Sequence, residues 1–208
     1  MDCPLASKPS TIQFHASIIL VGLAINAFMN SRSRQGFPLA KFAHRINNNA
    51  YAIFSLMLYL ALLLTHQADI QQKLGCIYHL SKFYEALDIY LFLLSGYFPN
   101  AHFAVHHSTT PVLTADSVIG HPASDWRLPA ILNTLHHFFL YSFFGGRAKF
   151  RKILPITGTA QLVVGIWKAG GTVMETGGER GTIAFSLYLV YAVLYAKELR
   201  DAKKAAEQ

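Results

Sequence analysis

The sequence predicts an all-α membrane protein in which residues 1–208 form a single domain of seven transmembrane helices around a buried, histidine-rich polar core. The chain is 52% hydrophobic, and only 14% of its residues are charged. A soluble domain carries roughly a quarter charged residues. Seven apolar stretches lie close to the ~17–25 residues that a helix needs to cross the hydrocarbon. Several contain charged or histidine side chains, which favour the interior of a helix bundle over lipid.

The seven stretches follow one another with short connections, and the fourth is short for a span. Their expected bounds are 14–30, 49–65, 76–96, 102–116, 128–144, 154–169 and 182–197. The residues before the first stretch lack the compact apolar core and small-residue cleavage site of a signal peptide. We therefore expect the first stretch to be retained as a membrane helix.

The basic residues support the count of seven because most of them fall in three clusters between or after the stretches. Seven spans place all three clusters on one side of the membrane, whereas removing a middle span would divide them. The positive-inside rule then predicts a cytoplasmic C-terminus and an N-terminus on the opposite side. This distribution is typical of membrane topology and not of a nucleic-acid-binding surface. The clusters are Arg32, Arg34, Lys41 and Arg45; Arg147, Lys149, Arg151 and Lys152; and Lys197, Arg200, Lys203 and Lys204, against Lys8, Lys73, Arg127 and Arg180 on the other side.

The third stretch carries three ionisable residues, Lys82, Glu85 and Asp88, which recur every three positions and so form one stripe on a helix. Lys82 and Glu85 can pair within one turn, while Asp88 has no obvious local partner. A charge cluster that snorkels to the membrane surface would be the simpler explanation. Three charges on one stripe favour a buried polar seam instead. We use the name polar seam for these three residues.

The fourth and fifth stretches each contain a pair of adjacent histidines. His106 and His107 point about 100° apart on a helix, and we expect His102 to lie at the membrane surface. In the fifth stretch, Asn133, His137 and Tyr141 share one face because their spacing is four. These three could simply form hydrogen bonds between helices. Two histidine pairs in consecutive spans favour chemistry.

Two other features carry little functional information. The glycine-rich segment 169–181 lacks the G-x-x-x-x-G-K-[ST] pattern of a phosphate loop and is interpreted as a flexible connection. Cys3 and Cys76 have no C-x-x-C partner, so they predict neither a zinc site nor a redox motif. A disulfide between them is compatible with the sequence, which gives no argument for it.

On three motifs the chain resembles the fatty-acid elongases of the endoplasmic reticulum, the condensing 3-oxoacyl-CoA synthases. Weaker similarities are the segment 34–39, similar to R-x-P-F-x-L, and Gln161 after the basic loop. The resemblance runs from about residue 34 to residue 161, with two departures: Phe103 stands at the first histidine of the box, and Ile89 where a threonine usually follows the aspartate. The motifs are K-x-x-E-x-x-D at Lys82, Glu85 and Asp88; the last two positions of H-x-x-H-H at His106 and His107; and N-x-x-x-H-x-x-x-Y at Asn133, His137 and Tyr141.

The resemblance implies that the protein lengthens a long-chain acyl-CoA by two carbons from malonyl-CoA, releasing carbon dioxide and CoA. These two thioesters would be its substrates, and it implies no cofactor, metal or nucleic acid. Membrane lipid and other enzymes of the elongation cycle would be its partners, in the endoplasmic reticulum membrane.

The resemblance also implies roles for individual residues. Because an imidazole can attack a thioester, His106 would be the nucleophile, His137 would support the second half-reaction, and His107 would be a base or an orienting partner. The polar seam would brace or polarise the site. Asn133 and Tyr141 would hold a thioester or enolate oxygen. The basic residues of the loop between the fifth and sixth stretches are explained equally well by the positive-inside rule and by binding of the CoA phosphates. The remaining residues expected to bind substrate are Gln161, Arg147, Lys149, Arg151 and Lys152.

Three alternatives remain open at this stage. A di-iron desaturase needs about eight histidine ligands, grouped in three histidine motifs. Only six of the ten histidines lie away from span ends and loops, and these six do not form three such motifs. A seven-helix transporter or receptor could use buried polar pairs for an ion or proton relay, although the two halves show no repeat. An elongase-like protein without activity is compatible with Phe103. The four histidines near span ends or in loops are His15, His44, His66 and His121.

Overall fold

The computed structural model of the protein contains helices and no strand among the residues that it describes, which confirms the all-α class for this part of the chain. These residues are 3, 17, 20–22, 24, 25, 27, 29, 35–119 and 126–207. The α-helices are α2 (Pro38–Leu64), α3 (Ala68–Leu94), α4 (Ala101–Thr114), α5 (Arg127–Phe144), α6 (Leu154–Glu175) and α7 (Thr182–Ala206), with a π-helix η1 (Ala115–Ile119) after α4 and a 3-10 helix η2 (Ala148–Lys152) before α6.

The predicted first span, 14–30, and basic residues Lys8, Arg32 and Arg34 lie mostly or wholly outside the described residues. Those residues between 17 and 29 that are described are all helical. Among them, Ile25 packs against an apolar cluster on α3 that includes Ile89. The chain before α2 therefore contacts the bundle at α3.

Several helices are longer than the apolar stretches that predicted them. Helix α2 begins at Pro38 instead of 49, α3 begins at Ala68 instead of 76, and α6 and α7 continue to Glu175 and Ala206. Hydropathy marks only the apolar part of a helix, whereas its backbone hydrogen bonds continue into polar sequence. Proline at the first position of α2 suits a helix start because its missing N–H has no helical partner there.

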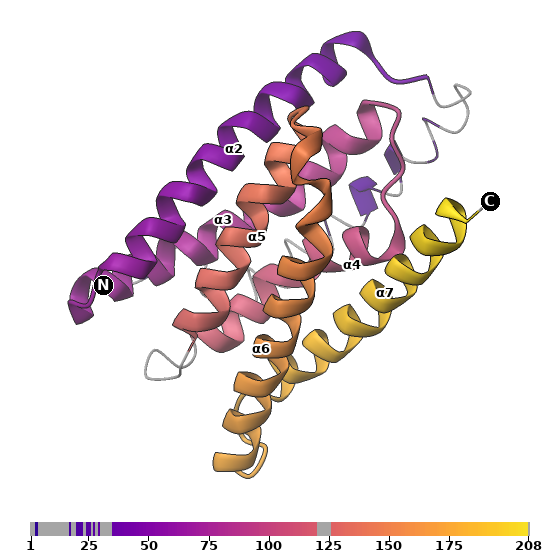
Figure 1. Ribbon diagram of the computed structural model, residues 1–208. Coiled ribbons are helices and arrows are strands. Elements are labelled where there is room, and N and C mark those ends of the chain that lie inside the picture. The colour runs from indigo at the N-terminus through magenta and orange to yellow at the C-terminus, as the bar shows by residue number, and fades with distance from the viewer. Residues whose placement is uncertain are drawn as a thin grey trace.

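The helices close into a ring. Helix α2 packs against α3 and α5, α5 against α6, α6 against α7, α7 against α4, and α4 against α3. Figure 1 shows α2 and α7 on opposite sides of this elongated bundle. Each helix therefore turns one face towards a common interior.

The buried residues of the ring include many polar and charged side chains beside its hydrophobic clusters, and many large apolar side chains are exposed. Charged side chains are rarely fully buried in a soluble protein unless they are paired. The buried residues of α2 include His44, Asn47, Asn48, Tyr51 and Ser55. The exposed apolar residues of α2 include Leu39, Phe42, Ile46, Ile53, Met57, Leu60 and Leu64. By length and composition alone, two of the described helices could cross a membrane, at Pro38–Leu64 and Thr182–Ala205.

Three basic segments lie towards one end of the bundle, called the basic end below: the start of α2, η2 and the last turns of α7. Lys73, Arg127 and Arg180 lie away from this end. The hydroxyl of Tyr195 in α7 donates to the Leu154 carbonyl at the start of α6, and Arg151 of η2 and Ala202 of α7 line the same cavity. The Phe37 N–H donates to the Leu94 carbonyl, which joins the start of α2 to the end of α3. Gly36 has no room for a side chain there, because a Cβ would lie 1.9 Å from the Ser95 carbonyl oxygen.

The opposite end of the bundle is joined by different contacts. Cys3 and Cys76 form a disulfide, which answers the question that the sequence left open. The Arg127 guanidinium donates to the Leu62 carbonyl at 2.6 Å and the Thr65 carbonyl at 2.7 Å. A cation on these free carbonyls stabilises the C-terminus of α2.

A stability prediction concerns Gly165, where α6 meets α7. A Cβ at this position would lie 2.3 Å from the Tyr188 ring, so Gly165→Ala is expected to lower the free energy of unfolding by about 1–3 kcal/mol. The matched control is Gly171→Ala in the same helix, where a Cβ would meet nothing within 4 Å. Alanine there should leave stability unchanged or raise it by up to ~1 kcal/mol. Thermal unfolding of both variants in detergent tests this, and equal midpoints would contradict the close contact.

Candidate active site

The polar seam of α3 is buried and linked to α5. Lys82 is 1% exposed, and its Nζ lies 2.6 Å from Glu85 Oε1. The same nitrogen donates to Asn133 Oδ1 on α5 at 2.5 Å. The predicted pairing of Lys82 with Glu85 is confirmed, and Asn133 joins it as a third member.

Glu85 connects four helices. Its Oε1 accepts a hydrogen bond from the Tyr51 hydroxyl of α2 at 2.7 Å, and His137 Nδ1 of α5 lies 3.1 Å from the same oxygen. Its backbone carbonyl lies 3.2 Å from His107 Nδ1 of α4. One residue of the seam therefore accepts a hydrogen bond from a tyrosine and lies within 3.2 Å of a ring nitrogen of two candidate histidines.

Asp88 has a partner that its own helix could not provide. Asn47 Nδ2 of α2 donates to Asp88 Oδ1 at 2.5 Å, and the Tyr84 hydroxyl donates to Asn47 Oδ1. Asp88 is only 3% exposed. It therefore braces α3 against α2 and does not line the cavity described below.

The two histidine pairs meet in space. The ring centroid of His137 lies 6.3 Å from that of His106 and 6.0 Å from that of His107. The His107 and His137 rings are nearly parallel, with 11° between their planes. Phe103, at the first position of the histidine box, stacks on the His107 ring at 4.0 Å between centroids.

These histidines line a cavity of about 510 Å³ at the basic end of the bundle. A volume of this size is typical of a small-molecule site. Two of the other candidate residues, Gln161 and Arg151, also line this cavity. The remaining basic residues of the loop are exposed and do not line it: Arg147, Lys149 and Lys152. The aromatic and other apolar lining comprises Phe92, Phe98, Pro99, Phe103, Leu140, Phe143, Phe144, Leu154, Pro155, Tyr195, Leu199 and Ala202.

Asn133 and Tyr141 lie behind the cavity wall. Asn133 Nδ2 donates to Gln161 Oε1 at 2.9 Å, so the seam reaches the cavity through Gln161. Tyr141 is 1% exposed and packs against Tyr51 with 4.5 Å between ring centroids. Both residues are therefore placed to support the site in this structure, and neither lines the cavity.

Several contributing residues were given no role in the site from the sequence. Tyr51 donates to Glu85 as described, and the Tyr78 hydroxyl donates to Asn133 Oδ1 at 3.1 Å. His102, expected at the membrane surface, lines the cavity, and its Nδ1 lies 3.1 Å from Glu198 Oε2 of α7. His136 also lines the cavity and is hydrogen-bonded through Nδ1 to Thr157 Oγ1 at 2.8 Å. No motif marks these residues, because their partners come from distant parts of the chain.

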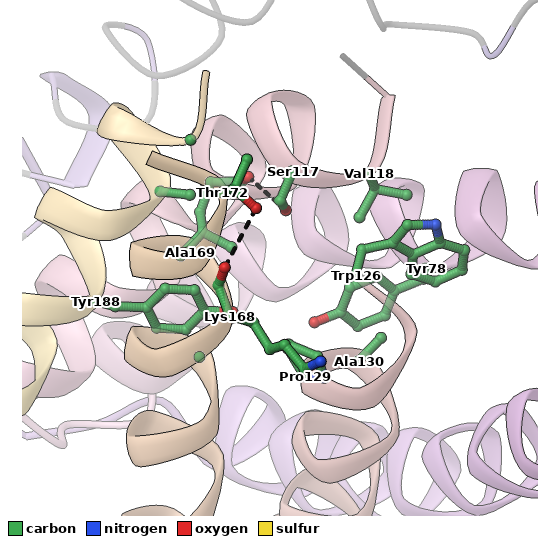
Figure 2. Close-up of a pocket in the computed structure, with 14 residues that line it drawn as sticks. Tyr78, Ser117, Val118, Trp126, Pro129, Ala130, Lys168, Ala169, Thr172 and Tyr188 are labelled. Carbon is green, nitrogen blue, oxygen red and sulfur yellow. Dashed lines mark hydrogen bonds between the residues drawn. The ribbon is translucent and has the colours of Figure 1, made fainter. Parts of the chain in front are cut away.

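A second, much smaller cavity of about 40 Å³ lies beyond Tyr78. Figure 2 shows Tyr78 and Trp126 on one side of it and Tyr188 of α7 on the other. The Tyr78 and Trp126 rings are stacked, with 17° between their planes. Because Tyr78 also bonds Asn133, this residue separates the small cavity from the polar seam.

The residue types of this site are those that proton transfer and nucleophilic attack use. Imidazoles from α4 and α5 line a largely apolar cavity, and the Glu85 carboxylate lies 3.1 Å from His137 Nδ1. A neutral imidazole can attack an activated carbonyl, and a second can carry a proton. Comparison with protein-family models, with curated proteins and with solved structures finds no match for this chain.

Proposed function

We propose that the protein is a condensing enzyme of fatty-acid elongation that joins a long-chain acyl-CoA to malonyl-CoA and forms a 3-oxoacyl-CoA. The observation that carries this proposal is that His106, His107 and His137 line one cavity, with Glu85 behind them. Condensation of two thioesters needs a nucleophile for the acyl group and a group that handles protons. A wall of several imidazoles supplies both.

The three motifs that resemble the elongases also support the proposal because they converge. Lys82 and Glu85 belong to one motif, His107 to the second, and Asn133 and His137 to the third. Hydrogen bonds and ion-pair contacts link all five residues. Residues that merely matched patterns by chance along the chain would have no reason to meet.

The cavity suits an acyl-CoA. Its phenylalanines and leucines provide an apolar surface for a hydrocarbon chain, and Arg151 lies on its lining at the basic end. An arginine at this position can hold a phosphate of the CoA through charge-assisted hydrogen bonds. The other three basic residues of the loop lie outside the cavity and would act on CoA only through their longer-range field.

We further propose that the protein crosses the endoplasmic reticulum membrane seven times, with its C-terminus in the cytoplasm. The exposed apolar side chains and the buried polar and charged side chains suit a lipid solvent. Arg151 of η2 and Ala202 near the end of α7 line the same cavity, and basic residues of these two segments on one side of the membrane would agree with the positive-inside rule. The disulfide between Cys3 and Cys76 lies away from that end, and disulfides persist in oxidising compartments such as the reticulum lumen.

This topology gives a direct prediction about the connection between α6 and α7. An N-glycosylation acceptor carried on a flexible insert after Gly178 is expected to be glycosylated, because the topology places this connection in the lumen. The same acceptor appended after the C-terminus should stay unmodified. A shift in mobility that a glycosidase reverses measures the modification. Glycosylation of the C-terminal acceptor would contradict the proposed orientation.

The catalytic proposal is tested with purified protein, a panel of acyl-CoAs and malonyl-CoA radiolabelled either in the carboxyl carbon, which leaves as carbon dioxide, or in the methylene carbon, which stays in the product. We expect release of carbon dioxide that depends on the acyl-CoA, together with a labelled 3-oxoacyl-CoA. Iron content, measured on the same preparation, tests the desaturase alternative. If no acyl-CoA in the panel stimulates release of carbon dioxide, the proposed activity is wrong, and a binding or transport function becomes the better explanation.

A further inference from the structure

We propose that His102 and His106 of α4 form a binding site for a transition-metal ion of the zinc class in the large cavity. His102 lies outside the three motifs that resemble the elongases, and that resemblance implies no metal. The proposal therefore goes beyond elongation and does not depend on it. The spacing of the two histidines, their buried nitrogens and the partner of His102 carry the argument.

The two histidines are four residues apart on α4, so they lie one turn apart on the same face of the helix. Zinc-binding helices that contribute two histidines use this spacing. The two ring centroids are 5.5 Å apart. A zinc–nitrogen bond of about 2.0–2.1 Å places a ring centroid about 3.2 Å from the ion, and two such rings at a tetrahedral angle are about 5.2 Å apart. The observed separation of the rings therefore fits one shared ion.

Each of the two rings has a buried nitrogen that lacks a partner. The His106 side chain is 7% exposed, and its Nδ1 has no hydrogen-bond partner among the described residues. His102 Nε2 is also buried and unpaired within the same part of the chain. A buried polar atom without a partner costs about 1–3 kcal/mol, and a bound ion or water is a common explanation for one. Two such atoms on neighbouring rings are explained together by one ion that both rings bind.

Glu198 of α7 prepares His102 to bind a metal. Its Oε2 lies 3.1 Å from His102 Nδ1. A carboxylate accepts the hydrogen bond, so Nδ1 of the neutral ring carries the proton and Nε2 keeps the lone pair. Nε2 is the nitrogen that is buried and unpaired. Histidines that bind a metal usually have a carboxylate or carbonyl on their other nitrogen, which orients the ring and raises its basicity.

Two tyrosines of α7 hold the rings in place without satisfying them. The Tyr195 ring centroid lies 4.9 Å from that of His102, and the Tyr191 ring centroid lies 4.7 Å from that of His106. Both tyrosine hydroxyls are already hydrogen-bonded, to a threonine of α4 and to a backbone carbonyl of α6. The two imidazoles are therefore positioned by packing, while their unpaired nitrogens remain able to bind a ligand.

The ligand types select the class of ion. Imidazole suits Zn²⁺, Cu²⁺ and Ni²⁺, whereas Mg²⁺ and Ca²⁺ prefer oxygen ligands. Both histidines line the cavity of about 510 Å³, so an ion can enter from the cavity, and water or another ligand in the cavity can complete its coordination. Structural zinc sites are closed by four protein ligands. Two histidines therefore indicate an exchangeable ion.

The test measures Zn²⁺ binding by the full-length protein in detergent, purified without a histidine tag and freed of metal. Competition with a chromophoric zinc chelator gives the stoichiometry and the dissociation constant. We expect one Zn²⁺ per protein molecule, which Mg²⁺ does not displace. His102→Gln and His106→Gln should each lose this ion, and Glu198→Ala should bind it about 10–100-fold more weakly. A protein that takes no zinc from the chelator would overturn the proposal, as would zinc binding that survives His102→Gln.

Two other histidine variants are matched controls, and both should bind Zn²⁺ as the unaltered protein does. His66→Gln removes an exposed histidine. His79→Gln removes a buried histidine that does not line the large cavity. Size-exclusion elution shows whether each variant is folded. Loss of zinc from either folded control would contradict the assignment to α4.

A measurement on the unaltered protein decides the matter if a ligand variant does not fold. Cu²⁺ also binds imidazole sites, and with ascorbate and oxygen a bound copper ion oxidises the side chains that hold it. Mass spectrometry of the peptides should find the added oxygen on His102 and His106. Oxidation confined to other histidines would overturn the site. Both readouts concern metal binding, so their outcome is separate from whether the protein elongates an acyl-CoA.

Discussion

His137→Gln is expected to reduce malonyl-CoA-dependent elongation by about 10²–10⁴-fold, the usual contribution of a general acid–base residue. Glutamine can still donate to the Glu85 carboxylate, but its amide cannot accept and return a proton at neutral pH. The effect should fall on the turnover number more than on substrate affinity, because proton transfer matters in the transition state. Release of labelled carbon dioxide under single-turnover and steady-state conditions measures the loss.

The matched control for this variant is His79→Gln. His79 is also a fully buried histidine, hydrogen-bonded through Nδ1 to Thr114 Oγ1 at 2.8 Å, but it does not line the large cavity. Its replacement should lower stability while the activity of the folded fraction stays within a few-fold of the unaltered protein. Equal loss of activity in both variants would mean that His137 acts only through the stability of the bundle.

The sequence predicted the fold where the pattern is local. The starts of α6 and α7 at residues 154 and 182 were predicted correctly, and α5 begins within one residue of its expected start. Apolar runs and their basic flanks are properties of adjacent residues, so they can be read without knowing how helices pack. The Lys82–Glu85 pair is local in the same sense, since one helical turn separates the two residues.

Contacts between distant helices could not be predicted in this way. Asp88 looked unpartnered because Asn47 lies 41 positions earlier in the chain. Tyr51 bonds Glu85 across 34 positions. To predict either contact one must know which face α2 turns inwards, and Asn47 lies outside the apolar stretch 49–65 that marked this helix. His107 Nδ1 contacts the Glu85 backbone carbonyl of another helix, and no side-chain motif records such a contact.

Lys82→Met is expected to cause the largest loss of stability, about 3–5 kcal/mol, because it leaves the buried Glu85 carboxylate without its cation. Lys82 Nζ contacts Glu85 Oε1 and Asn133 Oδ1 and lies 4.5 Å from the Tyr78 ring centroid. Methionine has a similar length but provides no charge and no donor. Thermal unfolding in detergent, followed by the loss of the monodisperse peak in size-exclusion chromatography, measures the effect.

The double variant Lys82→Met/Glu85→Gln separates charge from packing. Removing both charges takes away the uncompensated carboxylate, so the double variant should be more stable than Lys82→Met alone. The double variant should nevertheless be inactive, because the neutral amide introduced by Glu85→Gln cannot stabilise a protonated His137 as a carboxylate does. A double variant no more stable than Lys82→Met would show that the lysine acts through its contacts with Asn133 and Tyr78. Recovery of stability without activity would mean that the buried ion pair places a negative charge behind His137 and serves catalysis more than folding.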